Sequence, residues 1–321
     1  MVEVAPGIER IESVFGPRPF AQYLLRDDDR SMLIDTGIDS TPGDVIVPYF
    51  EQCGFEPASL TYVLTSHADV DHFGGNSALR KVARNAIFCA SGLDTPIITD
   101  RKRAMNERYG WYAEHGSGAD YDAETKGLLA AGMGPDSPID LELIGGEWFR
   151  LGPKLRVQVL ALPGHSPGHL GVWEPGSRSA IVIDAVLGQG LYNFDHKIIH
   201  PPPYMDAAAY ENTIEALRNL RPERLLTAHY DVMEGAEVGD FLDASADFLA
   251  RTRAGVRRVA AANGTVTLAG LLAALGPELG PFTSFPNELA GPIRSHLREL
   301  VTEGNVEMVP GASPPAWRWI G

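Results

Sequence analysis

Two histidines and two aspartates lie within six positions of the segment TSHADVDHFGG, residues 65–75. They are His67, Asp69, Asp71 and His72. In extended backbone, residues two apart point the same way, so His67, Asp69 and Asp71 would converge. Imidazole and carboxylate groups gathered at the end of an apolar strand are typical ligands of divalent metal ions. The segment therefore predicts part of a metal site, close enough together to serve two ions.

Three further candidate ligands stand where apolar strands are expected to end. They are His165 in LPGHSPGH, Asp184 in AIVIDAV and His229 in LLTAHYD. An aspartate at the end of an apolar run is costly to bury unless it is paired or binds a metal. Singly, each of these residues could be a hydrogen-bonded polar side chain or a cap. Seven such residues at loop positions, in a chain with nine histidines, instead predict one shared metal site.

The elements that must position these residues follow from the apolar pattern. Short apolar runs separated by turn residues predict antiparallel strands in the first 35 residues. Strands and helices then alternate to about residue 235, interrupted by a helical insertion at about residues 92–140. The insertion carries Tyr109, Trp111 and Tyr112, which could form an aromatic wall over the site or simply pack the insertion. This alternation indicates mixed α/β sheets with helices outside.

The pattern of apolar and polar residues changes near residue 237. Three helical patterns are followed by a small two-strand ending. We therefore expect a catalytic domain over residues 1–236 and a helical, winged-helix-like domain over residues 237–321.

Five motifs, in order, resemble the metallo-β-lactamase superfamily. They are LIDTG (with Asp35), SHADVDHFGG, PGHSPGH, IVIDA and TAHYD. The resemblance runs from about residue 8 to 235 and implies a four-layer αββα sandwich with two metal ions at one edge. The tail resembles the winged-helix module of some members, including an endoribonuclease, through GPIRSHLRELVTEGNVEMV.

The resemblance also implies a ligand set. His67, Asp69 and His165 would hold the first ion, while Asp71, His72 and His229 would hold the second, with Asp184 bridging. Asp35 would steady the loop, and His169 is not expected to be a ligand. Two divalent ions are expected, with zinc favoured and iron or manganese as alternatives.

Asp69 departs from the family pattern, which usually places a histidine there. A third carboxylate beside two divalent ions should weaken their Lewis acidity and favour harder ions than zinc. Alternatively, Asp69 falls short of the metal and leaves the first site weak or empty.

The implied function is a metal-dependent hydrolase in which a metal-bound hydroxide attacks an ester, thioester, lactone or related small molecule. Asp71 would position the hydroxide or move its proton, and Tyr192 could donate to the substrate oxygen or be structural. The alternatives are a di-iron redox enzyme, suggested by Asp69, an endoribonuclease-like phosphodiesterase, suggested by the tail, and a binding protein that has lost catalysis.

The formal charge of −15, from 27 basic and 42 acidic residues, disfavours nucleic acid as a partner. The arginines of RTRAGVRRV are expected to form a solvated helical face, and the tail is expected to pack on the core or on a second copy in a homodimer. No signal peptide or membrane-spanning run is evident, and two cysteines make no disulfide framework. These features predict a cytoplasmic protein that acts on a small molecule.

Overall fold

The computed structural model describes residues 2–321 and contains two large sheets packed face to face. The first sheet contains, in hydrogen-bonded order, β1 (Val2–Ala5), β2 (Ile8–Phe15), β3 (Arg18–Arg26), β4 (Ser31–Ile34), β5 (Tyr62–Leu64), β6 (Ile87–Ser91) and β7 (Leu141–Leu143). Neighbours are antiparallel from β1 to β4 and parallel from β4 to β7. The early hairpins agree with the antiparallel strands predicted for the first 35 residues, and the combination of antiparallel and parallel pairing agrees with the predicted mixed sheets.

The second sheet is antiparallel except at one pair. Its order is β15 (Met233–Glu234), β14 (Arg224–Thr227), β11 (Ser179–Ile183), β10 (Leu170–Glu174), β9 (Arg156–Ala161) and β8 (Trp148–Arg150). Only β11 and β14 run parallel, because α7 (Ala207–Leu220) crosses between them. A separate ribbon of β12 (Leu191–Tyr192) and β13 (Ile198–His200) precedes α7.

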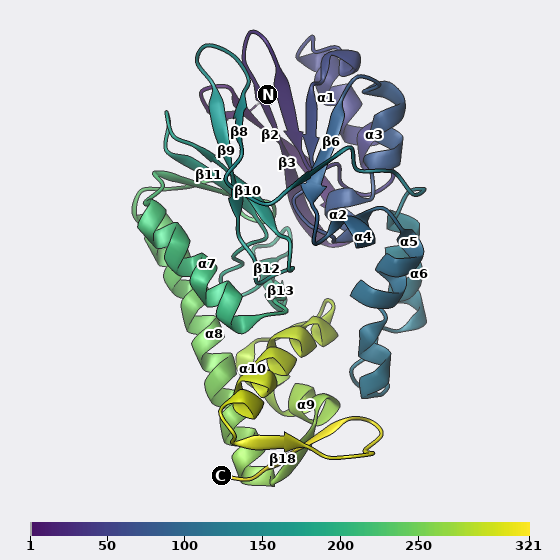
Figure 1. The fold of residues 1–321 in the computed structure, drawn as a ribbon, viewed down its shortest axis with the longest axis vertical. Coiled ribbons are helices and arrows are strands. Elements are labelled where there is room, and N and C mark those ends of the chain that lie inside the picture. The colour runs from purple at the N-terminus through teal and green to yellow at the C-terminus, as the bar shows by residue number, and fades with distance from the viewer. Residues whose placement is uncertain (1) are drawn as a thin grey trace.

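Helices cover the outer face of each sheet and complete four layers (Figure 1). The first sheet is covered by the π-helical turn η1 (Pro42–Ile46), α1 (Val47–Gln52) and α3 (Asn76–Val82); a short turn, η2 (Pro57–Ser59), leads into β5. Ile46, Phe50 and Leu79 from these helices pack on Leu33 and Val63. On the second sheet, α7 buries one face through Tyr210, Ile214 and Leu217, spaced as in an amphipathic helix.

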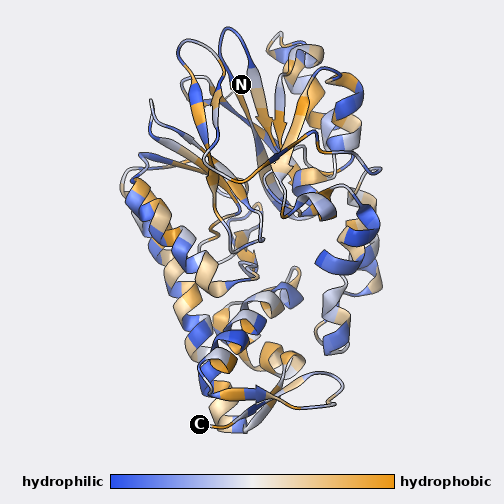
Figure 2. Ribbon diagram, viewed as in Figure 1, coloured by the Kyte–Doolittle hydropathy of each residue, from blue (hydrophilic) through white to orange (hydrophobic). Residues whose placement is uncertain are grey.

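The apolar core between the sheets holds the sandwich together. Tyr23, Leu25 and Met32 of the first sheet meet Val172 and Ile181 of the second, all fully buried. Figure 2 shows these strands as largely hydrophobic, whereas α7 and α8 (Ala236–Asn263) alternate hydrophobic and hydrophilic residues. The four-layer αββα sandwich is therefore confirmed.

The insertion consists of short helical segments beside the open edge of the sandwich (Figure 1). These segments are α4 (Thr95–Ile98), α5 (Arg101–Arg103), η3 (Ala104–Arg108), η4 (Trp111–His115) and α6 (Ala123–Gly132). Their buried side chains, including Tyr109, Tyr112 and Leu129, join the same apolar core as the C-terminal helices.

The C-terminal module contains three helices and a small sheet. Its elements are the second half of α8, then β16 (Thr265–Thr267), α9 (Leu268–Leu279), η5 (Pro286–Leu289), α10 (Ala290–Thr302), β17 (Val306–Met308) and β18 (Ala316–Trp319). The expected two-strand ending is in fact three-stranded, in the order β16-β18-β17, because residues 265–267 pair with β18. The winged-helix-like assignment stays a prediction, as does a boundary after residue 236, since α8 runs without a break from the sandwich into the module.

Glu299 on α10 is expected to stabilise this module in a pH-dependent way. Its carboxylate accepts hydrogen bonds from Arg253 on α8, at 2.9 and 3.0 Å, and from His296. Burial raises the pKa of Glu299, but these bonds outweigh burial and hold that pKa at about 2. Because the folded pKa lies below the unfolded value, the stabilisation is complete above about pH 4.5 and is lost as the pH falls towards 2.

The measurement is urea unfolding of Glu299→Gln at several pH values. At pH 7 the variant should be less stable by about 1–2 kcal/mol, less than the full shift implies, because solvent partly screens the carboxylate. The difference should shrink at pH 3. A difference independent of pH would contradict the assignment.

No helix within residues 2–321 combines the length and the apolar character that crossing a membrane requires.

Candidate metal centre

The candidate ligands lie beyond strand ends at one edge of the sandwich. His67 follows β5, Asp184 directly follows β11, and His229 follows β14. His165 comes from the loop between β9 and β10. Because the carboxyl ends of parallel strands meet at one edge, both sheets present side chains to the same place.

The segment 67–72 reaches the centre by a turn rather than by an extended strand. Asp69 is extended (φ −99°, ψ 145°), but the short helix α2 (Val70–Phe73) starts immediately after it. The alternation argument therefore holds for His67 and Asp69 only. The helical turn brings Asp71 and His72 to the centre together, so the expectation of three residues aligned in extended backbone was wrong.

The glycine pair that follows α2 is required by backbone crowding. A Cβ at Gly74 would lie 2.3 Å from the carbonyl oxygen of Gly132, and one at Gly75 would lie 2.4 Å from that of Thr36. Both distances are shorter than any side chain tolerates, so only glycine fits at these two positions.

The ligand atoms form two groups that share Asp184. One oxygen or nitrogen from each of His67, His165 and Asp184 lies within 4.8 Å of the others, and the same holds for Asp71, His72 and His229. The Asp184 Oδ2 atom also lies 3.4 Å from His72 Nε2 and 3.2 Å from His229 Nε2. Asp184 thus faces both groups, and its role as a bridging ligand stays a prediction.

The four histidines present the nitrogen atom that a metal ion requires. In each, Nδ1 lies within hydrogen-bond distance of a protein oxygen: Ser66 Oγ for His67, Asp35 Oδ2 for His72, Pro203 O for His165 and Pro19 O for His229. When Nδ1 carries the ring proton and donates it in a hydrogen bond, the Nε2 atom of a neutral imidazole has a free lone pair that can bind a metal ion. The Nε2 atoms of His67, His72 and His229 are buried without a hydrogen-bond partner, as is Asp184 Oδ1. These atoms fit a pair of divalent ions.

Asp35 holds the ligand loop as expected. Its Oδ1 accepts the Ser66 backbone N–H at 2.7 Å, and its Oδ2 accepts Ser66 Oγ and His72 Nδ1 at 2.9 and 2.8 Å. Asp35 has φ of 64°, a left-handed conformation that costs about 1–3 kcal/mol in a residue other than glycine. Carboxylates of this kind fix the ring orientation of a metal-binding histidine.

Asp184 is aimed by an unusual backbone conformation. Ile183, a β-branched residue, has φ of 51°, and the β11–β14 register shifts between residues 181 and 183.

His169 Nε2 accepts the Asp184 backbone N–H at 3.3 Å, and the His169 ring stacks on His67. Burial lowers the pKa of His169 well below its usual value, so its imidazole is neutral. His169 therefore lies outside both ligand groups and holds Asp184.

A buried carboxylate that the sequence analysis missed holds the His165 loop. Asp94 accepts Ser166 Oγ at 2.5 Å and the Gly168 backbone N–H at 2.9 Å. Asp94 is 1% exposed and lies in the insertion, where no spacing relates it to the PGHSPGH motif.

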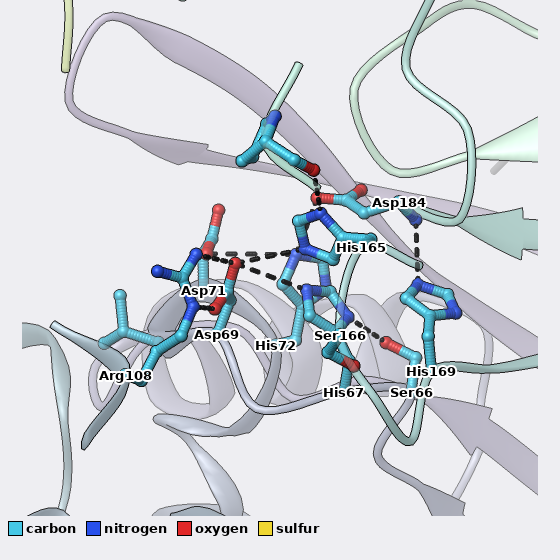
Figure 3. A network of polar contacts seen from close by, with 12 residues as sticks. Ser66, His67, Asp69, Asp71, His72, Arg108, His165, Ser166, His169 and Asp184 are labelled. Atoms are coloured by element: carbon cyan, nitrogen blue, oxygen red, sulfur yellow. Dashed lines mark hydrogen bonds and ion pairs between the residues drawn. The ribbon is translucent and has the colours of Figure 1, made fainter. Parts of the chain in front are cut away.

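Asp69 lies in a bidentate ion pair with Arg108 of the insertion (Figure 3). Arg108 Nε is 2.5 Å from Asp69 Oδ1, and Nη2 is 2.9 Å from Oδ2. The same Oδ2 lies 3.2 Å from His165 Nε2 and 3.6 Å from His67 Nε2. Asp69 therefore remains adjacent to the first group, and its role as a ligand stays a prediction. Nothing in the sequence pattern identified Arg108.

The ion pair extends into the C-terminal module through Glu288. Arg108 Nη2 is 3.4 Å from Glu288 Oε2, the Tyr112 hydroxyl donates to Oε2 at 2.9 Å, and the Tyr121 hydroxyl donates to Oε1. Of the expected aromatic wall, only Tyr109 lines the cavity; its hydroxyl accepts the Val70 N–H at 2.9 Å. The insertion and the module thus meet over the metal centre.

Two arginines correct the charge balance expected from the sequence. Four carboxylates line the cavity, from Asp69, Asp71, Asp184 and Glu288, together with the guanidinium groups of Arg18 and Arg108. Four negative and two positive charges sum to −2. A neutral histidine at position 69 would leave three carboxylates and two guanidinium groups, a sum of −1, so Asp69 adds one negative charge to the cavity. The Arg108 guanidinium, which is distant in sequence, pairs with Asp69 directly and offsets that charge.

The electrostatics keep the carboxylates of Asp69 and Asp184 ionised. Burial raises the pKa of Asp69, but the Arg108 guanidinium outweighs burial and holds that pKa well below its usual value. Burial also raises the pKa of Asp184, and His229 and His72 reverse the effect. Asp69 and Asp184 are thus in the ionised state that binds cations. Burial lowers the pKa of His67. Burial also lowers the pKa of His72 and of His165, but Asp184 beside His72 and Asp69 beside His165 outweigh burial and raise both pKa values above the usual one. A bound cation would therefore have to displace a proton from these two rings.

Tyr192 lies on the far side of His229. Both residues line a cleft of about 380 Å³, with Arg10, Phe194 and Tyr230 among its other walls. The cavity that contains Asp69, Asp71, His165 and Asp184 is a separate one, of about 30 Å³. The structure therefore leaves a catalytic role for Tyr192 as a proposal.

Comparison with known families settles the family. Residues 16–229 match the family described as the Metallo-beta-lactamase superfamily. The chain belongs to this superfamily. Superfamily members are mostly metal-dependent hydrolases and usually bind zinc.

Curated relatives and solved structures add detail. An N-acyl homoserine lactonase from Bacillus sp is 27% identical over 185 residues, 50% of this chain and 60% of the relative. A hydroxyacylglutathione hydrolase from Cereibacter sphaeroides is 29% identical over 31% of this chain and 44% of its own. The matches thus span about 60% or less of these relatives' lengths. A metallo-beta-lactamase family protein from Thermus thermophilus has the same fold, with a TM-score of 0.71 at 18% identity over 99% of this chain and 100% of its own.

Proposed function

We propose that the protein is a metal-dependent hydrolase with two divalent ions, zinc in preference to iron or manganese, that cleaves an ester, thioester or lactone bond in a small molecule. The observation that carries the proposal is the convergence of four histidines, each with Nδ1 held by a protein oxygen, on Asp71 and the shared Asp184. The relatives named as lactonases and hydroxyacylglutathione hydrolases support the substrate class.

Bound divalent ions would activate water and polarise the substrate carbonyl. His67, Asp69, His165 and Asp184 would hold one ion, and Asp71, His72, His229 and Asp184 the other. Asp71 would also move a proton from the attacking water to the leaving group. Its Oδ1 lies 3.8 Å from His72 Nε2 and its Oδ2 lies 3.8 Å from His229 Nε2, so no short hydrogen bond to these rings occupies the carboxylate. The insertion and the module would exclude water.

The two observations that suggested the alternative enzymes, the extra carboxylate of Asp69 and the arginines of the tail, carry less weight in the structure. Arg108 neutralises Asp69, so the extra carboxylate no longer argues for di-iron redox chemistry. The arginines expected to form a solvated face are each paired with acidic residues: Arg251 with Asp247, Arg253 with Glu211 and Glu299, Arg257 with Glu303, and Arg258 with Glu278. A helix neutralised in this way offers little to a phosphate backbone.

The test combines elemental analysis with a substrate screen. Protein reconstituted with zinc, manganese or iron is assayed on 4-nitrophenyl esters, acyl thioesters and N-acyl homoserine lactones. We expect about two ions per chain and turnover of at least one class with zinc. Uniform inactivity of fully loaded protein would contradict hydrolysis, and cleavage of single-stranded RNA at low salt would favour the nuclease alternative.

Tyr192→Phe tests the proposed donor to the substrate oxygen. If its hydroxyl acts in this way, kcat should fall roughly tenfold to a hundredfold, because one oriented donor is removed from the developing negative charge. Metal content should not change, since Tyr192 lies beyond His229 in the neighbouring cleft. An unchanged kcat would assign Tyr192 a structural role.

A further inference from the structure

Arg18 carries a buried guanidinium group in the metal-site cavity that makes no hydrogen bond to the described residues. It begins β3 opposite Phe15, at the tip of the β2–β3 hairpin. The side chain is 7% exposed, and its Nε atom is fully buried with no hydrogen-bond partner. Its nearest carboxylate oxygen, Asp71 Oδ2, is 3.8 Å from Nη2, too far for a hydrogen bond.

Arg108, which lines the same cavity, has acceptors for its guanidinium donors. It donates to both oxygens of Asp69 and reaches Glu288. Arg18 has the same five donors and uses none of them on the protein's own oxygens. Burying a hydrogen-bond donor without an acceptor costs free energy. Such a donor is therefore found mainly where a ligand or a water molecule accepts its hydrogen bond.

The surroundings hold the Arg18 guanidinium in place without satisfying it. The rings of Phe15 and Phe285 lie 5.9 and 5.2 Å from its central carbon, positions typical of cation–π contacts. These contacts fix the planar group while leaving its N–H edges free. An arginine fixed in this way is suited to bind a carboxylate through two parallel hydrogen bonds.

The carboxylate nearest to Arg18 is that of Asp71, a candidate metal ligand. Asp71 is one of the second group of ligands, so a cation held there would compete for its carboxylate. Arg18 would then face the cavity with no anionic partner. Arg18 lines the same cavity as Asp69, Asp71, His165 and Asp184, so a group bound by Arg18 would lie beside the candidate ligands.

We propose that Arg18 binds an anionic carboxylate of the substrate, so that the enzyme prefers esters, thioesters or lactones carrying a carboxylate near the bond that is cleaved. This inference rests on the proposed hydrolase function and adds a substrate class to it. Arg18 is a specificity residue at the entrance of β3, and Phe285 of the C-terminal module covers it.

The first experiment measures binding alone. Metal-loaded wild type, Arg18→Met and Arg18→Lys are titrated with glutarate by calorimetry. Wild type should bind glutarate, Arg18→Met should bind at least tenfold more weakly, and Arg18→Lys, which keeps the charge but loses the planar fork, should lie between them. Arg84→Met, which removes an exposed arginine, is the matched control.

The second experiment compares 4-nitrophenyl butyrate with the mono-4-nitrophenyl ester of glutaric acid. Wild type should have the higher kcat/KM on the glutarate ester, and Arg18→Met should reduce that preference at least tenfold, at unchanged metal content. Equal loss on both esters would mean that Arg18 acts on charge developing in any ester, and would overturn the proposal. So would a wild type that shows no preference, a result that requires no variant to fold.

The two experiments also separate this proposal from the hydrolase function. If neither ester is cleaved by fully loaded protein, the proposed function fails, and the glutarate titration still decides whether Arg18 binds carboxylates. If both esters are cleaved and glutarate does not bind wild type, the hydrolase stands and Arg18 has no such role.

Discussion

Replacing Asp184 with alanine is expected to remove metal from both ligand groups and to abolish turnover. Asp184 is the one carboxylate that lies within ligand distance of both histidine pairs, with Oδ2 3.2 Å from His229 Nε2 and 3.4 Å from His72 Nε2. Without it, each group keeps fewer donors, and no carboxylate is shared by the two groups to offset the charge of two neighbouring cations.

The expected loss in kcat/KM is roughly a thousandfold or more, since the metal's contribution is several kcal/mol and about 4 kcal/mol corresponds to that factor. Elemental analysis should show fewer than one ion per chain, compared with about two in wild type. His165→Ala should give the same result for the first group. Asp44→Ala, at an exposed position on η1, is the control. Full metal content with unchanged activity in Asp184→Ala would show that the chemistry takes place elsewhere.

A double-mutant cycle at Asp69 and Arg108 is expected to show strong coupling. The pair is buried and bidentate, with distances of 2.5 and 2.9 Å. In metal-free protein, Arg108→Met leaves the Asp69 carboxylate without its counter-charge. Asp69→His leaves the Arg108 guanidinium beside an imidazole, with Glu288 as its remaining anionic partner. Each single change should destabilise the protein by about 3–5 kcal/mol, because breaking a buried pair leaves an uncompensated charge.

The double variant Asp69→His/Arg108→Met should recover much of that loss, since a neutral imidazole and an apolar side chain replace two opposite charges. Glu288 loses Arg108 but keeps the hydroxyl donors of Tyr112 and Tyr121. Urea unfolding gives the coupling, and elemental analysis should show metal content restored in the double variant. The exposed pair Arg103–Glu107, in the same insertion, is a matched control and should show little coupling. Additive effects at Asp69 and Arg108 would mean that Arg108 does not compensate Asp69.

The sequence was most informative where local pattern and local chemistry agree. The early hairpins, the strand ending near His67 and the alternation of strands with helices to about residue 235 all follow from apolar spacing and turn residues. His67, His165, Asp184 and His229 were identified because polar residues that end buried strands need a partner. Strand alternation placed Asp71 in the centre for the wrong reason, and only the family resemblance placed His72 there, because a short helical turn orients both residues.

Contacts between distant segments were not accessible from the sequence. Arg108 is 39 positions from Asp69, and Glu288 is 180 positions from Arg108, in segments whose own patterns show only ordinary helices. The expectation of a harder metal ion followed from counting Asp69 alone, and the count changed once Arg108 was found beside it. Likewise, β16 pairs with β18 across two helices, which is why the module's sheet has a third strand.

The sequence by itself indicated mixed α/β sheets and, through motifs that resemble the superfamily, the four-layer sandwich and the candidate ligands, because periodicity and motif chemistry are properties of neighbouring residues. Only the tertiary structure decided the charge of the centre, the atoms that hold each histidine ring, and the exposure of Arg18 to the cavity. Those properties depend on distances between side chains far apart in the chain, and Coulomb and hydrogen-bond energies vary steeply with such distances.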